Sequence, residues 1–130
     1  MPATLFYDSD CGFCRWSLAK ILAWDRRGVV KPAALDSPEA DIALAGIPDE
    51  ERMSSWHFVD PAGRLHSAGA GFAPLLRLLP GGTPLAAAAA RAPRMTERAY
   101  RWVAGRRSVF GRLVTDGAKR RADERIARRL

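Results

Sequence analysis

The feature that most constrains this chain is the position of its two cysteines, Cys11 and Cys14, which form a single Cys-x-x-Cys pair. The apolar residues 3–7 before the pair predict a short strand, and residues 8–10 supply turn and helix-capping side chains. After the pair, apolar side chains recur at helical spacing, which predicts a helix over residues 11–27 with Cys14 on its inward side. Two thiols at a helix start that follows a strand are the arrangement used for thiol-disulfide exchange.

The length of the chain favours reactive rather than structural thiols. A chain of 130 residues can bury a core without cross-links. A disulfide between Cys11 and Cys14 would close a very short loop and would stabilise the fold little. The start has no signal-peptide pattern and no apolar run approaches the roughly 18 residues of a membrane span, so we expect a cytoplasmic location, where disulfides are transient and catalytic.

The remaining sequence alternates strand and helix patterns before it becomes wholly helical. A second strand, a short helix, a β-hairpin and another helix are predicted at residues 29–35, 37–46, 55–67 and 72–79. Further helices are predicted at residues 85–91 and 95–105, followed by a basic helical segment over residues 109–130. We therefore expect an α/β core over residues 1–83 and a helical extension over residues 84–130 that packs on it.

Charge is concentrated in the second part of the chain. The net charge of +7 divides into −2 for residues 1–90 and +9 for residues 91–130. Such a tail is compatible with contact to a nucleic acid, an anionic membrane surface or an acidic partner. Because it lacks interleaved aromatic residues or a recognisable motif, we interpret it first as a solvated helix.

The two sulfurs are expected to have different roles. At the helix N-terminus, unpaired N–H groups and the helix dipole favour the Cys11 thiolate and lower its pKa from about 8.5, so Cys11 is the predicted attacking sulfur. Cys14, one turn further on, is the predicted resolving sulfur, which attacks the mixed disulfide. The spacing of three positions places both side chains on one helical turn, as a disulfide requires.

Two other interpretations of the cysteines stay open. Free cysteines are among the most buried residue types, so both thiols are inert in the first alternative. In the second, His57 and His66 complete a metal site, although their spacing differs from the usual His-x₃₋₅-His pattern, or a Cys pair binds metal between two chains. Outside a metal site, each histidine is expected to be a surface strand residue.

Acidic and aromatic residues near the pair are further candidates. Asp8 is predicted either to accept the proton of Cys14 during resolution or to fix the turn, whereas Asp10 is expected to cap the helix. Phe13 and Trp16 are predicted to contact substrate at the rim of the site, or else to pack the first helix. The later residues Tyr100, Trp102 and Arg107 are interpreted as structural.

The residues around the pair resemble a known family. The segment Tyr7-Asp8-Ser9-Asp10-Cys11-Gly12-Phe13-Cys14 is similar to the Asp-x-x-Cys-x-x-Cys signature of the DCC family of thiol-disulfide oxidoreductases (DUF393). Residues 68–70, 79–80 and 100–107 are similar to later segments of that family, so the likeness extends to about Leu113. The element order β-α-β-α-β-β-α also resembles the thioredoxin fold, which implies a three-layer α/β sandwich with a helical C-terminal extension.

The resemblance implies a reaction class and partners. It implies a thiol-disulfide oxidoreductase that acts on a protein or small-molecule disulfide, takes electrons from an external thiol reductant and needs no bound cofactor. Thioredoxins place a proline before the third strand to position peptide substrates, but residues 53–55 offer none, and Ser55 is the expected substrate contact there. The alternative is a non-catalytic interaction module that binds a protein, a nucleic acid or a membrane surface through its basic tail.

Overall fold

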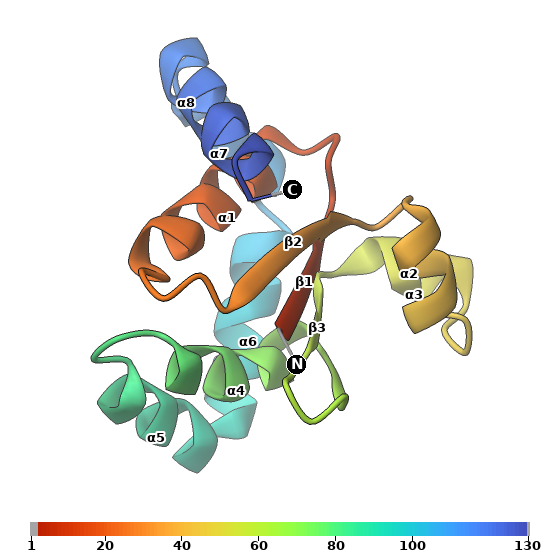
Figure 1. Cartoon of the computed structure of the whole chain (residues 1–130), viewed down its shortest axis with the longest axis vertical. Helices are drawn as coiled ribbons and strands as arrows, with labels where there is room; N and C mark the ends of the chain where they lie inside the picture. The colour runs from red at the N-terminus through yellow and green to blue at the C-terminus, as the bar shows by residue number, and fades with distance from the viewer. Residues whose placement is uncertain (1–2, 130) are drawn as a thin grey trace.

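The computed structural model of the chain describes residues 3–129 and contains a four-stranded mixed sheet in the order β2-β1-β3-β4 (Figure 1). The central strand β1 (Ala3–Tyr7) pairs in parallel with β2 (Val30–Ala34) and antiparallel with β3 (His57–Val59). Strand β4 (Leu65–Ser67) pairs antiparallel with β3 at the edge. The predicted strands and the hairpin are thus confirmed.

Helices cover both faces of this sheet and give the molecule three layers (Figure 1). One face carries α1 (Gly12–Trp24) and α4 (Phe72–Leu78), and the other carries α2 (Pro38–Ala43). Successive side chains of a strand point to opposite faces, so β1 contributes to two separate cores. The larger core includes Leu5, Tyr7, Leu18, Leu22, Phe58 and Leu75, and the smaller one includes Phe6, Leu35 and Leu44. This arrangement confirms the predicted thioredoxin-like α/β fold.

Helix α1 ends at Trp24, earlier than the predicted Arg27, because the next residue turns the chain into β2. The fully buried carboxylate of Asp25 accepts hydrogen bonds from the backbone amides of Val29 (3.2 Å) and Val30 (2.8 Å). These two bonds hold the connection between α1 and β2.

A short helix, α3 (Asp49–Ser54), was not expected from the sequence. It follows Pro48 and has three acidic residues in its first turn, a combination that favours a helix start. The Arg52 side chain donates to the carbonyl of Leu35 (2.9 Å) and forms an ion pair with Asp41 (2.7 Å). Helix α3 is thereby fastened to the connection between β2 and α2.

The chain between β4 and α4 passes very close to a C-terminal helix. This 3-10 turn, η1 (Ala68–Gly71), begins at Ala68 with a left-handed φ of 54°. A Cβ at Gly69 would lie 2.7 Å from the Cα of Glu97, and the Gly69 amide donates to the Glu97 carboxylate at 2.9 Å. Only a glycine leaves space for this approach, which fixes the position of α6 (Pro93–Ala104).

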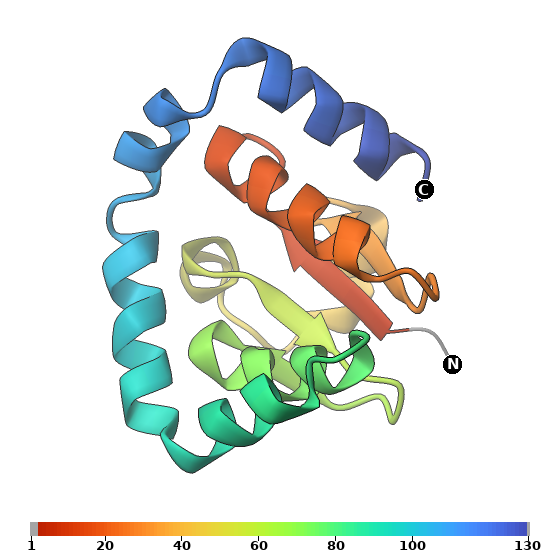
Figure 2. The same ribbon diagram turned by 90° about the vertical axis from the view of Figure 1, so that its left-hand side faces the viewer.

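The C-terminal helices run around α1 and the sheet (Figure 2). After α5 (Thr83–Arg91) and α6 come α7 (Arg107–Leu113) and α8 (Asp116–Ala127), instead of one helix over residues 109–130. The break occurs because the hydroxyl of Thr115 caps α8 by accepting from the amide of Ala118 at 3.1 Å. No helix within residues 3–129 has the length and apolar character needed to cross a membrane.

Helix α8 lies along α1 with one face buried. Ala122 and Ile126 are buried, and Asp123 forms an ion pair with Arg15 of α1 at 2.9 Å. The arginines of α8 stay largely exposed. Helix α8 thus packs one face on α1 and exposes its arginines on the other.

Candidate active site

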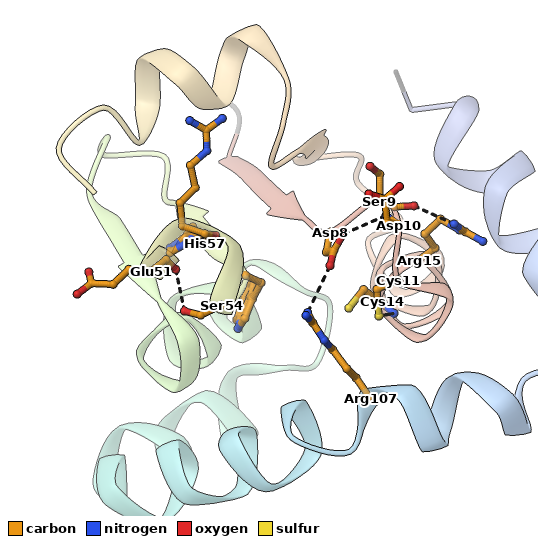
Figure 3. Close-up of polar contacts among 12 residues, drawn as sticks. Asp8, Ser9, Asp10, Cys11, Cys14, Arg15, Glu51, Ser54, His57 and Arg107 are labelled. Atoms are coloured by element: carbon orange, nitrogen blue, oxygen red, sulfur yellow. Dashed lines mark hydrogen bonds and ion pairs between the residues drawn. The ribbon is translucent and has the colours of Figure 1, made fainter. Parts of the chain in front are cut away.

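The two thiols lie at the start of α1, beside the end of β1 (Figure 3). Cys11 is itself the N-cap of the helix, and its sulfur accepts a hydrogen bond from the backbone amide of Cys14 at 3.2 Å. The prediction that Asp10 caps α1 is therefore wrong. The N-cap position places a sulfur where the helix leaves amide groups without helical partners.

Asp8 has two contacts at the end of β1 (Figure 3). One carboxylate oxygen accepts from the amide of Asp10 at 3.0 Å, which fixes the turn before the cysteines. The other lies 3.4 Å from the guanidinium of Arg107, at the start of α7. The turn role expected as one alternative for Asp8 is present, and the ion pair links the turn to the C-terminal helices.

The thiol of Cys14 is hard to ionise in this environment. Burial, followed by the hydrogen bond and charge of Cys11, raises the pKa of the Cys14 thiol to about 12. The positive charge of Arg107 acts in the opposite direction and the negative charge of Asp8 adds to the rise. Burial alone would lower the pKa of Arg107, but attraction to Cys14, Cys11 and Asp8 raises it.

A cavity of about 520 Å³ opens beside Cys14, between α1, the sheet, α4 and α6. Its walls are predominantly apolar, with the polar side chains of Asp8 and Arg107 among the lining residues. Among the side chains that line it are Cys14, Phe13, Ser55, Trp56, Tyr100 and Val103.

The structure separates the three predicted substrate contacts. Phe13 and Ser55 line the cavity, so they lie on the same recess as Cys14. Trp16 does not line it and instead borders a second hollow, between α1 and α8, with Lys20 held 5.4 Å from its ring centre. The rings of Phe13 and Trp16 stack with centroids 6.0 Å apart, which makes Trp16 a packing partner of Phe13.

Two residues interpreted as structural lie at the site. Arg107 pairs with Asp8, and Tyr100 lines the cavity, where its hydroxyl accepts from the backbone amide of Trp56 at 3.1 Å. Burial raises the pKa of Tyr100. The helical spacing of Tyr100, Val103 and Ala104 is a sequence signal for one face of α6, although nothing local shows what that face meets or that Arg107 of α7 lies beside it.

The histidines lie away from the thiols, around the β3–β4 hairpin. His57 is buried, not a surface residue as expected, because its ring nitrogens contact the Ser67 hydroxyl (2.6 Å) and the Arg52 carbonyl (3.0 Å). His66 pairs with Asp60 at 2.9 Å. Within residues 3–129, no three side chains of His, Cys, Asp or Glu gather as a metal-binding group.

No curated protein and no solved structure matches the chain. The model of the DCC1-like thiol-disulfide oxidoreductase family matches residues 5–113, a span that contains both cysteines, Asp8 and Arg107. Since the match extends over most of the sequence, the chain belongs to the DCC1-like thiol-disulfide oxidoreductase family.

Proposed function

We propose that the protein exchanges disulfides through Cys11 as the attacking sulfur and Cys14 as the resolving sulfur. The observation that carries this proposal is the N-cap position of the Cys11 sulfur, which accepts from the Cys14 amide at 3.2 Å. That amide and the helix dipole favour a negatively charged sulfur at this point. Cys14, with a pKa of about 12, keeps its proton at neutral pH until the resolving step.

The reaction balances with two sulfurs and two electrons. The Cys11 thiolate attacks one sulfur of the substrate disulfide, and the other substrate sulfur leaves as a thiolate and takes a proton. Cys14 then loses its proton and attacks the Cys11 sulfur of the mixed disulfide. The second substrate thiol is released, and the enzyme is left with a Cys11–Cys14 disulfide.

Asp8 and Arg107 are proposed to assist the resolving step. The Asp8 carboxylate, near both thiols at the end of β1, is the proposed acceptor of the Cys14 proton (Figure 3). The guanidinium of Arg107 lowers the energy of the Cys14 thiolate as it forms, because it opposes the rise in the Cys14 pKa. Arg107 is thus a candidate site residue alongside Phe13 and Ser55, which border the same cavity.

An external thiol reductant closes the cycle by reducing the Cys11–Cys14 disulfide. The sulfurs carry both electrons, so the proposed reaction uses no resident cofactor. A reducing compartment such as the cytoplasm is the environment in which a transient disulfide of this kind operates.

Single cysteine variants test the assignment. Cys11→Ser is expected to abolish reduction of a disulfide substrate with dithiothreitol as reductant. Cys14→Ser is expected to accumulate a mixed disulfide on Cys11 that mass spectrometry detects. Ser108→Ala, an exposed change in α7, is the control and is expected to retain full activity. Normal turnover by Cys11→Ser would contradict the proposal.

A second candidate function is binding of an anionic partner by the hollow between α1 and α8. This hollow of about 300 Å³ is bordered by Trp16, by one acidic side chain, Glu124, and by the basic side chains Lys20, Arg121, Arg125 and Arg128. A basic surface beside an aromatic ring favours phosphate-bearing ligands such as a nucleic acid.

The test of this second candidate is binding of a labelled single-stranded oligonucleotide at several salt concentrations. The triple change Arg121→Ala, Arg125→Ala and Arg128→Ala is expected to weaken binding and flatten its salt dependence. Deleting the tail is a poorer test, because it removes Arg129, which holds α8 to α1. Binding that the triple variant retains in full would exclude this surface.

A further inference from the structure

One wall of the cavity is the apolar side of the amphipathic helix α6. Thr96, Ala99, Tyr100, Val103 and Ala104 of α6 all line the cavity. They recur at the three- and four-residue spacing of one helix face. No residue of α6 is fully buried, and this face borders the cavity, where the Tyr100 ring packs on Phe72 with centroids 5.9 Å apart. Figure 2 shows α6 standing across the ends of α1 and α4.

The charged side chains that line the described cavity are Asp8 and Arg107. Asp8 and Arg107 lie 3.4 Å apart as an ion pair, and Cys14 keeps its proton because burial raises its pKa to about 12. The formal charge of this group is zero. The cavity therefore has a mostly apolar lining with no unpaired charge, which disfavours an anionic substrate.

The size of the cavity favours a small molecule. Its volume of about 520 Å³ lies within the roughly 300–1,000 Å³ of small-molecule sites. Helix α6 bounds one side, and the close approach of Gly69 to Glu97 fixes that helix against η1. An alkyl or aryl group fits such a recess, whereas the flat surface of a folded protein does not enter it.

We propose that the substrates are small uncharged disulfides that carry an apolar group, and that this group occupies the cavity while the disulfide lies beside Cys11 and Cys14. This inference rests on the proposed function and names its substrate class. The Cys11 thiolate breaks the substrate S–S bond, the apolar thiol leaves with a proton, and Cys14 releases the remaining thiol as the enzyme disulfide forms. A dithiol reductant returns both electrons.

A homologous substrate series measures the contribution of the cavity. The probes are 2-hydroxyethyl alkyl disulfides with methyl, propyl and pentyl groups, reduced with dithiothreitol after subtraction of the uncatalysed rate. Transfer of each methylene from water to an apolar site is expected to raise kcat/KM by up to about fourfold. Oxidised glutathione, which is charged, is expected to be the poorest substrate.

Matched variants on α6 distinguish the contribution of the cavity to turnover from that of the rest of the site. Ala99→Trp fills the cavity from an exposed position, so folding is expected to be unaffected, and it should remove the dependence on alkyl length. Arg98→Trp adds the same ring at an exposed position outside the cavity and should leave the dependence intact. Binding of an unreactive dialkyl thioether to Cys11→Ser, followed by calorimetry, is expected to weaken in the Ala99→Trp background.

The outcomes distinguish this inference from the function on which it rests. Turnover that is independent of alkyl length and unchanged by Ala99→Trp would overturn the substrate assignment and leave the oxidoreductase proposal standing. Failure to reduce any disulfide would overturn both.

Discussion

The guanidinium of Arg129 lies 2.8 Å from the carboxylate of Asp25, although 104 positions separate the two residues in the sequence. The same guanidinium donates to the carbonyls of Leu22 (3.0 Å) and Asp25 (2.7 Å), at the end of α1, and to the carbonyl of Val30 in β2 (3.1 Å). The C-terminal helix is thus fastened to the last turn of the helix whose first turn carries the thiols.

Removal of this contact is expected to destabilise the whole domain. Arg129→Ala leaves the buried Asp25 carboxylate without its cation, and loss of one partner of a buried pair costs about 3 kcal/mol. Urea unfolding followed by circular dichroism measures the loss as a lower midpoint. Arg128→Ala, at an exposed neighbouring position, is the control and is expected to match the unaltered protein. Equal midpoints for both variants would argue against the contact.

The two thiols are expected to differ in reactivity with iodoacetamide. Because burial and Cys11 raise the pKa of Cys14 to about 12, Cys14 stays protonated and unreactive from pH 7 to 9. Mass spectrometry of the reduced protein should therefore find a single modification, on Cys11. In Cys11→Ser, where one cause of the raised pKa is gone, alkylation of Cys14 should begin at a lower pH. Equal labelling of both thiols at pH 7 would contradict this assignment.

Loss of the Arg107 charge is expected to slow the resolving step. Arg107→Met removes the cation that opposes the rise in the Cys14 pKa, so formation of the Cys14 thiolate becomes harder. Loss of a charge-assisted contact of this kind is expected to slow the resolving step about tenfold or more. Quench-flow detection of the mixed disulfide should reveal its accumulation. Arg106→Met is the matched control, since the Arg106 side chain lies over the Trp102 ring, and Arg107→Lys should recover part of the rate.

Acid is expected to destabilise the fold through His57. Burial lowers the pKa of His57 below its usual value of about 6.5, so the unfolded chain binds the proton more readily than the folded chain. The free energy of unfolding should therefore fall as the pH drops below about 6.5, until the folded-state pKa is passed. His57→Gln should lack this part of the pH dependence, and His66→Gln should keep it. A pH profile that the His57 variant leaves unchanged would exclude the mechanism.

The close approach at Gly69 offers a test of how α6 is positioned. In Gly69→Ala the new methyl group meets the Glu97 backbone, so overpacking is expected to destabilise the protein by about 1–3 kcal/mol. The displaced α6 should also weaken binding of apolar ligands in the cavity. Gly46→Ala, where nothing lies within 4 Å of the added Cβ, is the control for stability and for binding.

The predictable parts of this protein are those that depend on neighbouring residues in the sequence. Apolar residues recur at strand or helix spacing in three local segments, and each of the three is present in the structure: the strand over residues 3–7, the helix that follows the cysteines and the hairpin. Helix boundaries were less accurate, because the end of α1 depends on Asp25 and a distant arginine. The cap of α1 was assigned to Asp10, whereas the Cys11 sulfur takes that position.

Local periodicity and turn chemistry specify the order of strands and helices, and they place the two thiols at a helix start. The surroundings of those thiols follow from the packing of distant segments: Arg107 of α7 and Tyr100 of α6 lie at the site, while Trp16 borders another hollow. The sequence of an amphipathic helix shows that the helix has an apolar face. Which element this face contacts depends on how the whole chain packs.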